Sequence, residues 1–192
     1  MLHIILIAIA AFIVLFIIIA AMQPNEFRVT RSVGIAAPPE NIFPRVNDLH
    51  KWEAWSPWAK MDPACKNSYA GATAGTGAIS AWAGNKKVGE GQMTITESRP
   101  NELIRIKLEF LKPFKSTNTA EFTFKAEGGQ TLVTWSMSGK NNFFFKAFSL
   151  FVNCDKMVGR DFEKGLAALK SVAEAEGKNQ PPEHLPWQPG RT

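Results

Sequence analysis

The chain has 192 residues, which is enough for one sizeable domain and too few for two comfortable ones. Its formal net charge of +5 suggests nucleic acid or anionic lipid as partners. The lysines are scattered singly or in pairs, with no basic run or arginine-rich stripe, so we expect no nucleic-acid binding.

The first segment of the chain is a candidate membrane anchor. Residues 2–22 are apolar except for His3, and their number matches the ~20 residues that a helix needs to cross a bilayer. We expect a retained single-pass helix over residues 1–23. A cleaved signal peptide is the alternative, although its apolar region is usually ~7–15 residues and follows a basic start. Arg28 and Arg31 after the span favour a cytoplasmic domain.

From Glu26 onward the sequence alternates with a period of two, which is typical of strands with one buried face. In the first strand Phe27, Val29, Val33 and Ile35 share one parity, and Arg31 is the exception. Proline favours a first helical turn and cannot continue a sheet ladder. Ala-Pro-Pro-Glu at 37–40 therefore predicts a short helix after this strand.

A tryptophan-rich stretch follows, WEAWSPWAKMDP at 52–63. Trp52 and Trp55 stand at helical spacing until Ser56-Pro57 ends the turn. Six more strands then alternate between short turns such as GATAGTG at 71–77, and the clearest of them carries Ile104, Ile106, Leu108 and Phe110 on one side. Their short connections predict antiparallel pairing.

The period then changes to that of a helix. Apolar residues recur at spacings of three and four from Val158 to Ala173, which predicts an amphipathic helix over residues 155–176. The Pro-rich remainder, residues 177–192, predicts a disordered tail. One long helix must cover the apolar face of about seven strands. We therefore expect an α+β fold over residues 26–176 in which a curved antiparallel sheet wraps around the last helix.

This order of elements resembles the helix-grip fold of the START-like (SRPBCC) superfamily, and within it the polyketide cyclase/dehydrase-like group of membrane-anchored bacterial proteins. The resemblance is carried by IAAPPENIFPRVND at 35–48, WEAWSPWAKMDP at 52–63, the WAGN and VGEGQMTITE strands within 82–97, and GRDFEKGLAALK at 159–170. It implies a cavity between sheet and helix. It does not imply one activity, because such domains transfer lipids, bind hormones, cyclise polyketides or assist other proteins.

The residues expected to face that cavity are mostly apolar, which favours a hydrophobic small molecule or a lipid as the ligand. Simple core packing is the alternative for each of them. We expect Trp58 to be the most mobile of its segment, at the mouth of the cavity or at the bilayer interface. The candidate ligand-binding residues are Trp55, Trp58, Trp82, Met93, Ile106, Phe110, Phe122, Trp135, Phe162 and Leu166.

Catalytic signals are few. His50 is the one histidine within the domain, and no nucleophile elbow, zinc spacing or paired-carboxylate motif is present. We expect no catalytic residue, no metal and no cofactor. Cys65 and Cys154 form no C-x-x-C pair, and the sequence does not decide whether they form a disulfide. Two rival functions stay open: a polyketide cyclase/dehydratase-like enzyme, and a protein-interaction module that uses residues 143–148, although we expect that segment to be a buried connection.

Overall fold

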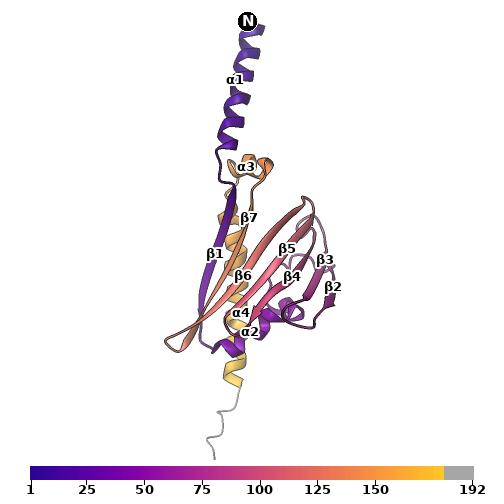
Figure 1. Ribbon diagram of the computed structural model, residues 1–192, viewed down its shortest axis with the longest axis vertical. Helices are drawn as coiled ribbons and strands as arrows, with labels where there is room; N and C mark the ends of the chain where they lie inside the picture. Colours follow the sequence, from indigo (N-terminus) through magenta and orange to yellow (C-terminus); the bar gives the residue numbers. More distant parts are fainter. Residues whose placement is uncertain (180–192) are drawn as a thin grey trace, which may run out of the picture.

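The computed structural model describes residues 1–179 and consists of a long apolar helix joined to an α+β domain (Figure 1). Three helical segments precede or interrupt the early part of the sheet: α1 (Leu2–Ala21), α2 (Pro39–Asn47) and the 3₁₀ helix η1 (Leu49–Ala54). Two helices follow the sheet, α3 (Phe143–Ser149) and α4 (Cys154–Asn179). Helix α4 therefore includes the first residues of the predicted tail, and residues 180–192 of that tail lie outside the described part.

Seven antiparallel strands form one sheet in the order β1-β7-β6-β5-β4-β3-β2, which confirms the predicted helix-grip architecture. The long connection between β1 and β2 carries α2 and η1, and short turns join the remaining strands. The bounds are β1 (Glu26–Ile35), β2 (Lys66–Gly71), β3 (Ala78–Ala83), β4 (Glu90–Arg99), β5 (Leu103–Lys112), β6 (Ser116–Glu127) and β7 (Gln130–Lys140).

Helix α4 packs against the sheet, with its closest contacts on β1 (Figure 1). Its residues Phe162, Leu166 and Leu169 are buried against inward-facing residues of β1, β5, β6 and β7. The end of the sheet near α2 carries a second layer of buried side chains, Ile42 and Val46 among them. The inward face of the sheet, toward α4, is called the concave face below.

Arg31, the exception to the alternation of β1, does face α4. Its guanidinium donates hydrogen bonds to Glu163 Oε1 at 2.7 Å and to Asp155 Oδ2 at 3.0 Å, both on α4. Gly159 lies between them, and a Cβ there would come within 2.0 Å of Arg31 Nη2. The inward arginine is therefore an ionic connection between the first strand and the last helix.

Helix α1 is long and apolar enough to cross a membrane, a property that an N-terminal signal sequence shares. It extends away from the sheet at the end where α3 lies (Figure 1). The expectation that residues 143–148 form a buried connection is wrong. They form most of α3, in which no residue is buried, because the segment lies beyond the end of β7 rather than between the sheet and α4.

Candidate ligand-binding surface on the open half of the sheet

The structure divides the ten predicted ligand-binding residues into two groups. Each residue of the first group is at most 2% exposed and is surrounded by protein atoms; these are Trp55, Ile106, Phe122, Trp135, Phe162 and Leu166. Each residue of the second group is partly exposed; these are Trp58, Trp82, Met93 and Phe110. Apart from Trp58, the second group lies on a different half of the concave face from the first.

The half nearer α2 is filled by aromatic rings. Trp135 stacks on Phe162 with ring centroids 4.0 Å apart and an angle of 6° between the planes, and on Phe122 at 4.7 Å. Trp52 and Trp55 stand edge-on to Trp135 at 6.2 and 5.7 Å. Such arrangements are favourable for aromatic pairs. The tryptophan-rich stretch is therefore a major part of the core, and it closes this half of the concave face.

Hydrogen bonds fix the two buried tryptophans of that stretch. Trp52 Nε1 donates to the Val46 carbonyl at 2.9 Å, and Trp55 Nε1 donates to the Arg45 carbonyl at 3.1 Å. Trp58 is edge-on to Trp135 at 5.6 Å and to Phe162 at 6.4 Å. Trp58 is thus the outermost ring of the interior aromatic cluster.

The half nearer α1 is more open. Strand register places Ser80, Met93, Leu108, Asn118 and Gly139 in one row across β3 to β7, because directly paired residues point to the same face. A second row nearer the sheet end contains Trp82, Gly91, Phe110 and Ser116. Trp82 meets Phe110 edge-on at 5.8 Å. We call these two rows the open half. Its larger apolar side chains remain partly exposed. The small residues between them leave part of this surface uncovered by side chains.

Asn118 is the polar residue of the open half that the sequence reasoning missed. It is 7% exposed, and its Oδ1 lies over Gly139, where a Cβ would approach to 2.1 Å. The alternation of β6 contained the signal, since Asn118 shares parity with Ala120, Phe122 and Phe124. An amide at this position brings both hydrogen-bond donors and an acceptor to a mostly apolar surface.

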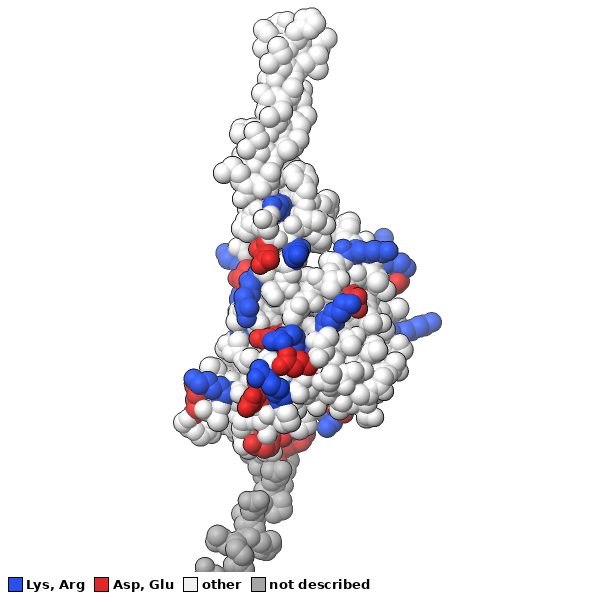
Figure 2. Space-filling view, viewed as in Figure 1, with Lys and Arg blue, Asp and Glu red and all other residues white. Residues whose placement is uncertain are grey.

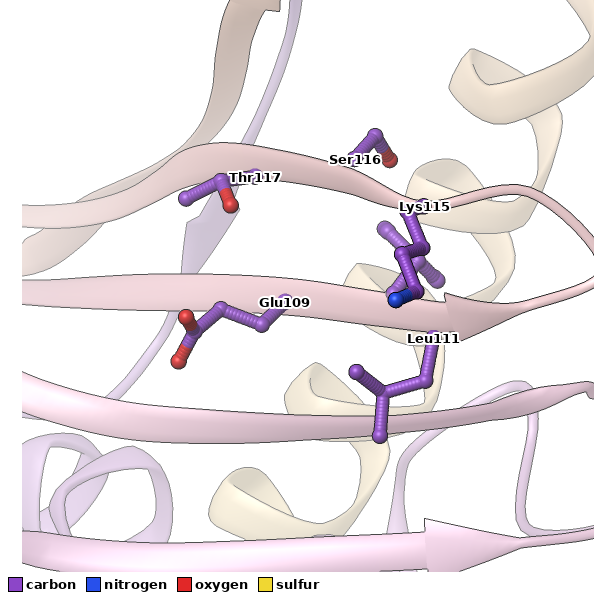
Figure 3. Close-up of a pocket in the computed structure, with 6 residues that line it drawn as sticks. Glu109, Leu111, Lys115, Ser116 and Thr117 are labelled. Carbon is purple, nitrogen blue, oxygen red and sulfur yellow. The ribbon is translucent and has the colours of Figure 1, made fainter.

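A separate depression of about 270 Å³ lies near the end of the β5–β6 hairpin. Glu109, Leu111 and Lys115 line it, with α4 behind the strands (Figure 3). Glu109 and Leu111 alternate with the inward Leu108 and Phe110, so this depression opens on the outer face of the sheet. Phe110 is the predicted ligand-binding residue that contributes to it. Phe110 and Ser116 of the open half also line it, so the depression borders the open half from the outer side.

The family of the chain follows from its match to a model described as polyketide cyclase / dehydrase and lipid transport, over residues 26–174. The chain belongs to this family. The match covers the whole sheet and most of α4, and α1 precedes it. No curated protein matches the chain.

Solved structures similar to this family member share its fold. TTHA0849 from Thermus thermophilus is 15% identical with a TM-score of 0.57, and the match covers 78% of this chain and 99% of that one. The Aha1 dimer from Colwellia psychrerythraea is 17% identical with a TM-score of 0.52, covering 77% and 96%. DynU16, from the dynemicin biosynthetic locus, is 15% identical with a TM-score of 0.55, covering 78% and 48%. These likenesses establish the fold alone.

Cyclase or dehydratase chemistry requires groups that move protons. In this member of the cyclase, dehydrase and lipid-transport family, His50 lies at the β2 edge of the sheet, beside Tyr69, whose register partner Ser80 belongs to the open half. Its Nδ1 is 3.0 Å from Asp48 Oδ1, and its ring stacks on Tyr69 at 4.0 Å. Burial, with the charges of Glu53 and Asp48, raises the pKa of Tyr69. Asp48 also caps η1 through the His50 N–H, so this group has a structural role.

Several other ionisable groups lie outside the open half. Arg105 bridges Glu97 and Glu121 on the outer face of the sheet. Within residues 1–179 there is no group of three or more His, Cys, Asp or Glu that could hold a metal ion. Cys65 and Cys154 are both free thiols, which answers the question that their spacing left open. Burial and the nearby Asp62 carboxylate raise the pKa of the Cys65 thiol.

Proposed function

We propose that this protein is anchored in a membrane by α1 and holds a hydrophobic small molecule or a lipid on the open half of its concave face. The observation that carries the proposal is a set of partly exposed apolar side chains in two adjacent rows, Trp82, Met93, Leu108 and Phe110, beside a buried amide at Asn118. A mostly apolar surface with a few placed polar groups is typical of small-molecule sites.

The energetics favour a largely apolar ligand. Removing apolar surface from water contributes ~25 cal/mol per Å², so covering ~200 Å² would contribute about 5 kcal/mol before the entropic cost of binding. Asn118 would orient a carbonyl, ester or hydroxyl group by hydrogen bonding. The aromatic cluster around Trp135 forms the closed end of the site, which limits how far a ligand extends toward α2.

The location supports a ligand that comes from the bilayer. The open half lies toward the end of the sheet from which α1 extends. Basic residues after α1, Arg28 among them, favour a domain on the cytoplasmic side. A ligand held here would therefore be exchanged close to lipid.

The residue types favour binding over turnover. Among the described residues, the inward positions of β3 to β7 carry no histidine and no carboxylate, and their polar side chains near the open half are Ser80, Ser116 and Asn118. A cyclase or dehydratase would need a proton donor or acceptor at the ligand. No contact at these inward positions of β3 to β7 supports that rival function.

The experiment uses full-length protein in nanodiscs that contain a lipid with a photoactivatable group in its acyl chain. After illumination, peptides cross-linked to lipid are located by mass spectrometry. We expect cross-links on the inward residues Met93, Leu108 and Phe110. Leu108→Gln should reduce them several-fold, whereas the matched outward change Lys107→Gln on the same strand should not.

Two outcomes would contradict the proposal. Cross-links confined to α1 and α3 would show that lipid does not reach the concave face. Equal effects of Leu108→Gln and Lys107→Gln would show that any labelling of β5 is independent of that face. Near-ultraviolet circular dichroism of both variants establishes that the aromatic core is intact.

A further inference from the structure

The exposed large apolar side chains of the domain are concentrated at one end. Among residues 23–179, Tyr69 is the one exposed large apolar side chain that lies elsewhere, and it stacks on His50. Leu111 and Met157 lie at the end of β5 and the start of α4. The others form what we call the α3 phenylalanine cluster: Phe114, Phe143, Phe144, Phe148 and Phe151. Exposed apolar patches of this kind mark interaction surfaces.

The α3 phenylalanine cluster is continuous with α1. Phe16 of α1 stacks on Phe151 with ring centroids 6.1 Å apart, and Ala20 of α1 is fully buried. Phe114, in the β5–β6 turn, contacts Phe144 at 5.2 Å. The cluster therefore extends from the helix that would enter the bilayer to the hairpin that borders the open half.

Helix geometry sets the depth of these contacts. Twenty residues at 1.5 Å each give α1 a length of about 30 Å, which equals the hydrocarbon thickness. Phe16 precedes Ala21 by five residues, which is about 7.5 Å along the helix axis. If α1 spans the bilayer, the ring of Phe151 at the level of Phe16 lies within the acyl chains.

Polar groups surround the cluster at the level expected for lipid headgroups. Lys146 Nζ donates to the Ala21 carbonyl at 3.2 Å and to Asn25 Oδ1 at 2.6 Å, at the C-terminal end of α1. Lys112, Lys115 and Lys140 are exposed at the strand ends on the same side. Figure 2 shows α1 without charged side chains and the first lysines and arginines where the domain begins. Cations at this depth are attracted to anionic lipid.

We infer that the α3 phenylalanine cluster inserts into the lipid leaflet beside α1, so that the domain is held against the bilayer by its own side chains as well as by its anchor. The inference rests on the membrane anchoring in the proposed function, and it is independent of any ligand on the concave face. A short helix with phenylalanines toward lipid and a lysine at the boundary is typical of interfacial attachment.

The test uses full-length protein in which Cys65 and Cys154 are changed to serine, reconstituted in nanodiscs of phosphatidylcholine and phosphatidylglycerol. Single cysteines at Phe144→Cys, Phe148→Cys or Phe151→Cys carry a fluorophore whose emission reports polarity. Lipids with a spin label on the acyl chain quench fluorophores within the leaflet. The matched control is Glu127→Cys at the C-terminal end of β6, at the opposite end of that strand from Phe114.

We expect blue-shifted emission and loss of most of the fluorescence at positions 144, 148 and 151, and neither effect at position 127. Quenching at none of the three positions would overturn the inference. A blue shift without quenching, accompanied by energy transfer between labelled copies, would overturn it in favour of a protein partner. Ile9→Cys in α1 separates the two proposals, because an unquenched label there would contradict the membrane anchor itself.

Discussion

The guanidinium of Arg31 occupies the space in front of Gly159, where a Cβ would lie 2.0 Å from Nη2 and 2.4 Å from Cζ. Arg31 comes from β1, and Gly159 lies in the second turn of α4. The glycine lets the arginine reach both Asp155 and Glu163 across the helix. The fit explains why a glycine is present inside a helix, where it is ordinarily unfavourable.

Gly159→Ala should therefore destabilise the domain. Alanine is better than glycine by about 0.8–1 kcal/mol in an exposed helix interior. Here the added methyl group displaces the Arg31 guanidinium from Asp155 and Glu163, and we expect the free energy of unfolding to fall instead of showing that gain. Thermal unfolding in detergent measures the change, with Lys156→Ala on the exposed side of the same helix as the control. A gain in stability would show that Arg31 moves away at no cost.

The free energy of unfolding should fall on acidification, because carboxylates that are paired with arginines become protonated. The hydrogen bond from Arg31 lowers the pKa of Asp155 below its ordinary 3.8, and Arg45 likewise lowers the pKa of Glu176 below 4.5. A carboxylate with a lowered folded-state pKa stabilises the fold above its unfolded pKa, and this contribution is lost as the pH falls through the folded value. Arg31→Gln should flatten the decline in melting temperature below about pH 4. An unchanged decline would contradict the role of this ion pair.

The stack of Phe162 on Trp135 should contribute strongly to stability. Phe162→Ala removes a ring that is 1% exposed, and large-to-small changes of this type cost about 3–5 kcal/mol. Phe162→Leu keeps most of the volume and should cost clearly less. Lys164→Ala, on the exposed side of α4, should change the unfolding free energy by less than about 0.5 kcal/mol. Chemical denaturation followed by tryptophan fluorescence compares the three variants, and a cost for Phe162→Ala near that of Lys164→Ala would contradict this packing.

Cys65 should react slowly with alkylating reagents at neutral pH. Burial and the negative charge of Asp62 raise its pKa above the ordinary value of a thiol, and the thiolate is the reactive form. We expect its alkylation rate, measured by mass spectrometry of the digested protein, to keep rising beyond pH 9. Both thiols should also be titratable after denaturation without reductant. A rate for Cys65 that levels off below pH 9, or a missing pair of thiols, would contradict the assignment.

The alternation of apolar residues predicted the sheet well because burial on one face imposes a period of two on every strand. Arg31 broke that pattern, and only the position of α4 explains why its charge is acceptable there. The alternation of β6 was sufficient to predict that Asn118 faces inward. Its importance, however, depends on the partly exposed neighbours Met93 and Leu108, which come from separate strands.

The predicted ligand-binding residues required tertiary information that a linear pattern does not contain. Trp55 and Trp82 are both tryptophans near strand or helix ends, and the sequence gives no reason to separate them. In the structure Trp55 is enclosed by Phe122 and Trp135, whereas Trp82 stands at the open edge with Phe110. Likewise, the apolar composition of residues 143–148 suggested burial, but α3 lies beyond the sheet and beside α1, so its phenylalanines remain exposed.

The connection between α1 and β1 consists of residues 22–25, which extend over at most about 14 Å. Lys146 and Asn141 attach this linker to the end of the domain that carries α3, through Asn25 and Pro24. With α1 in a bilayer, such a short and attached linker keeps the domain close to the membrane surface and limits its change of orientation. Its movement is then confined to the two-dimensional path along which α1 diffuses.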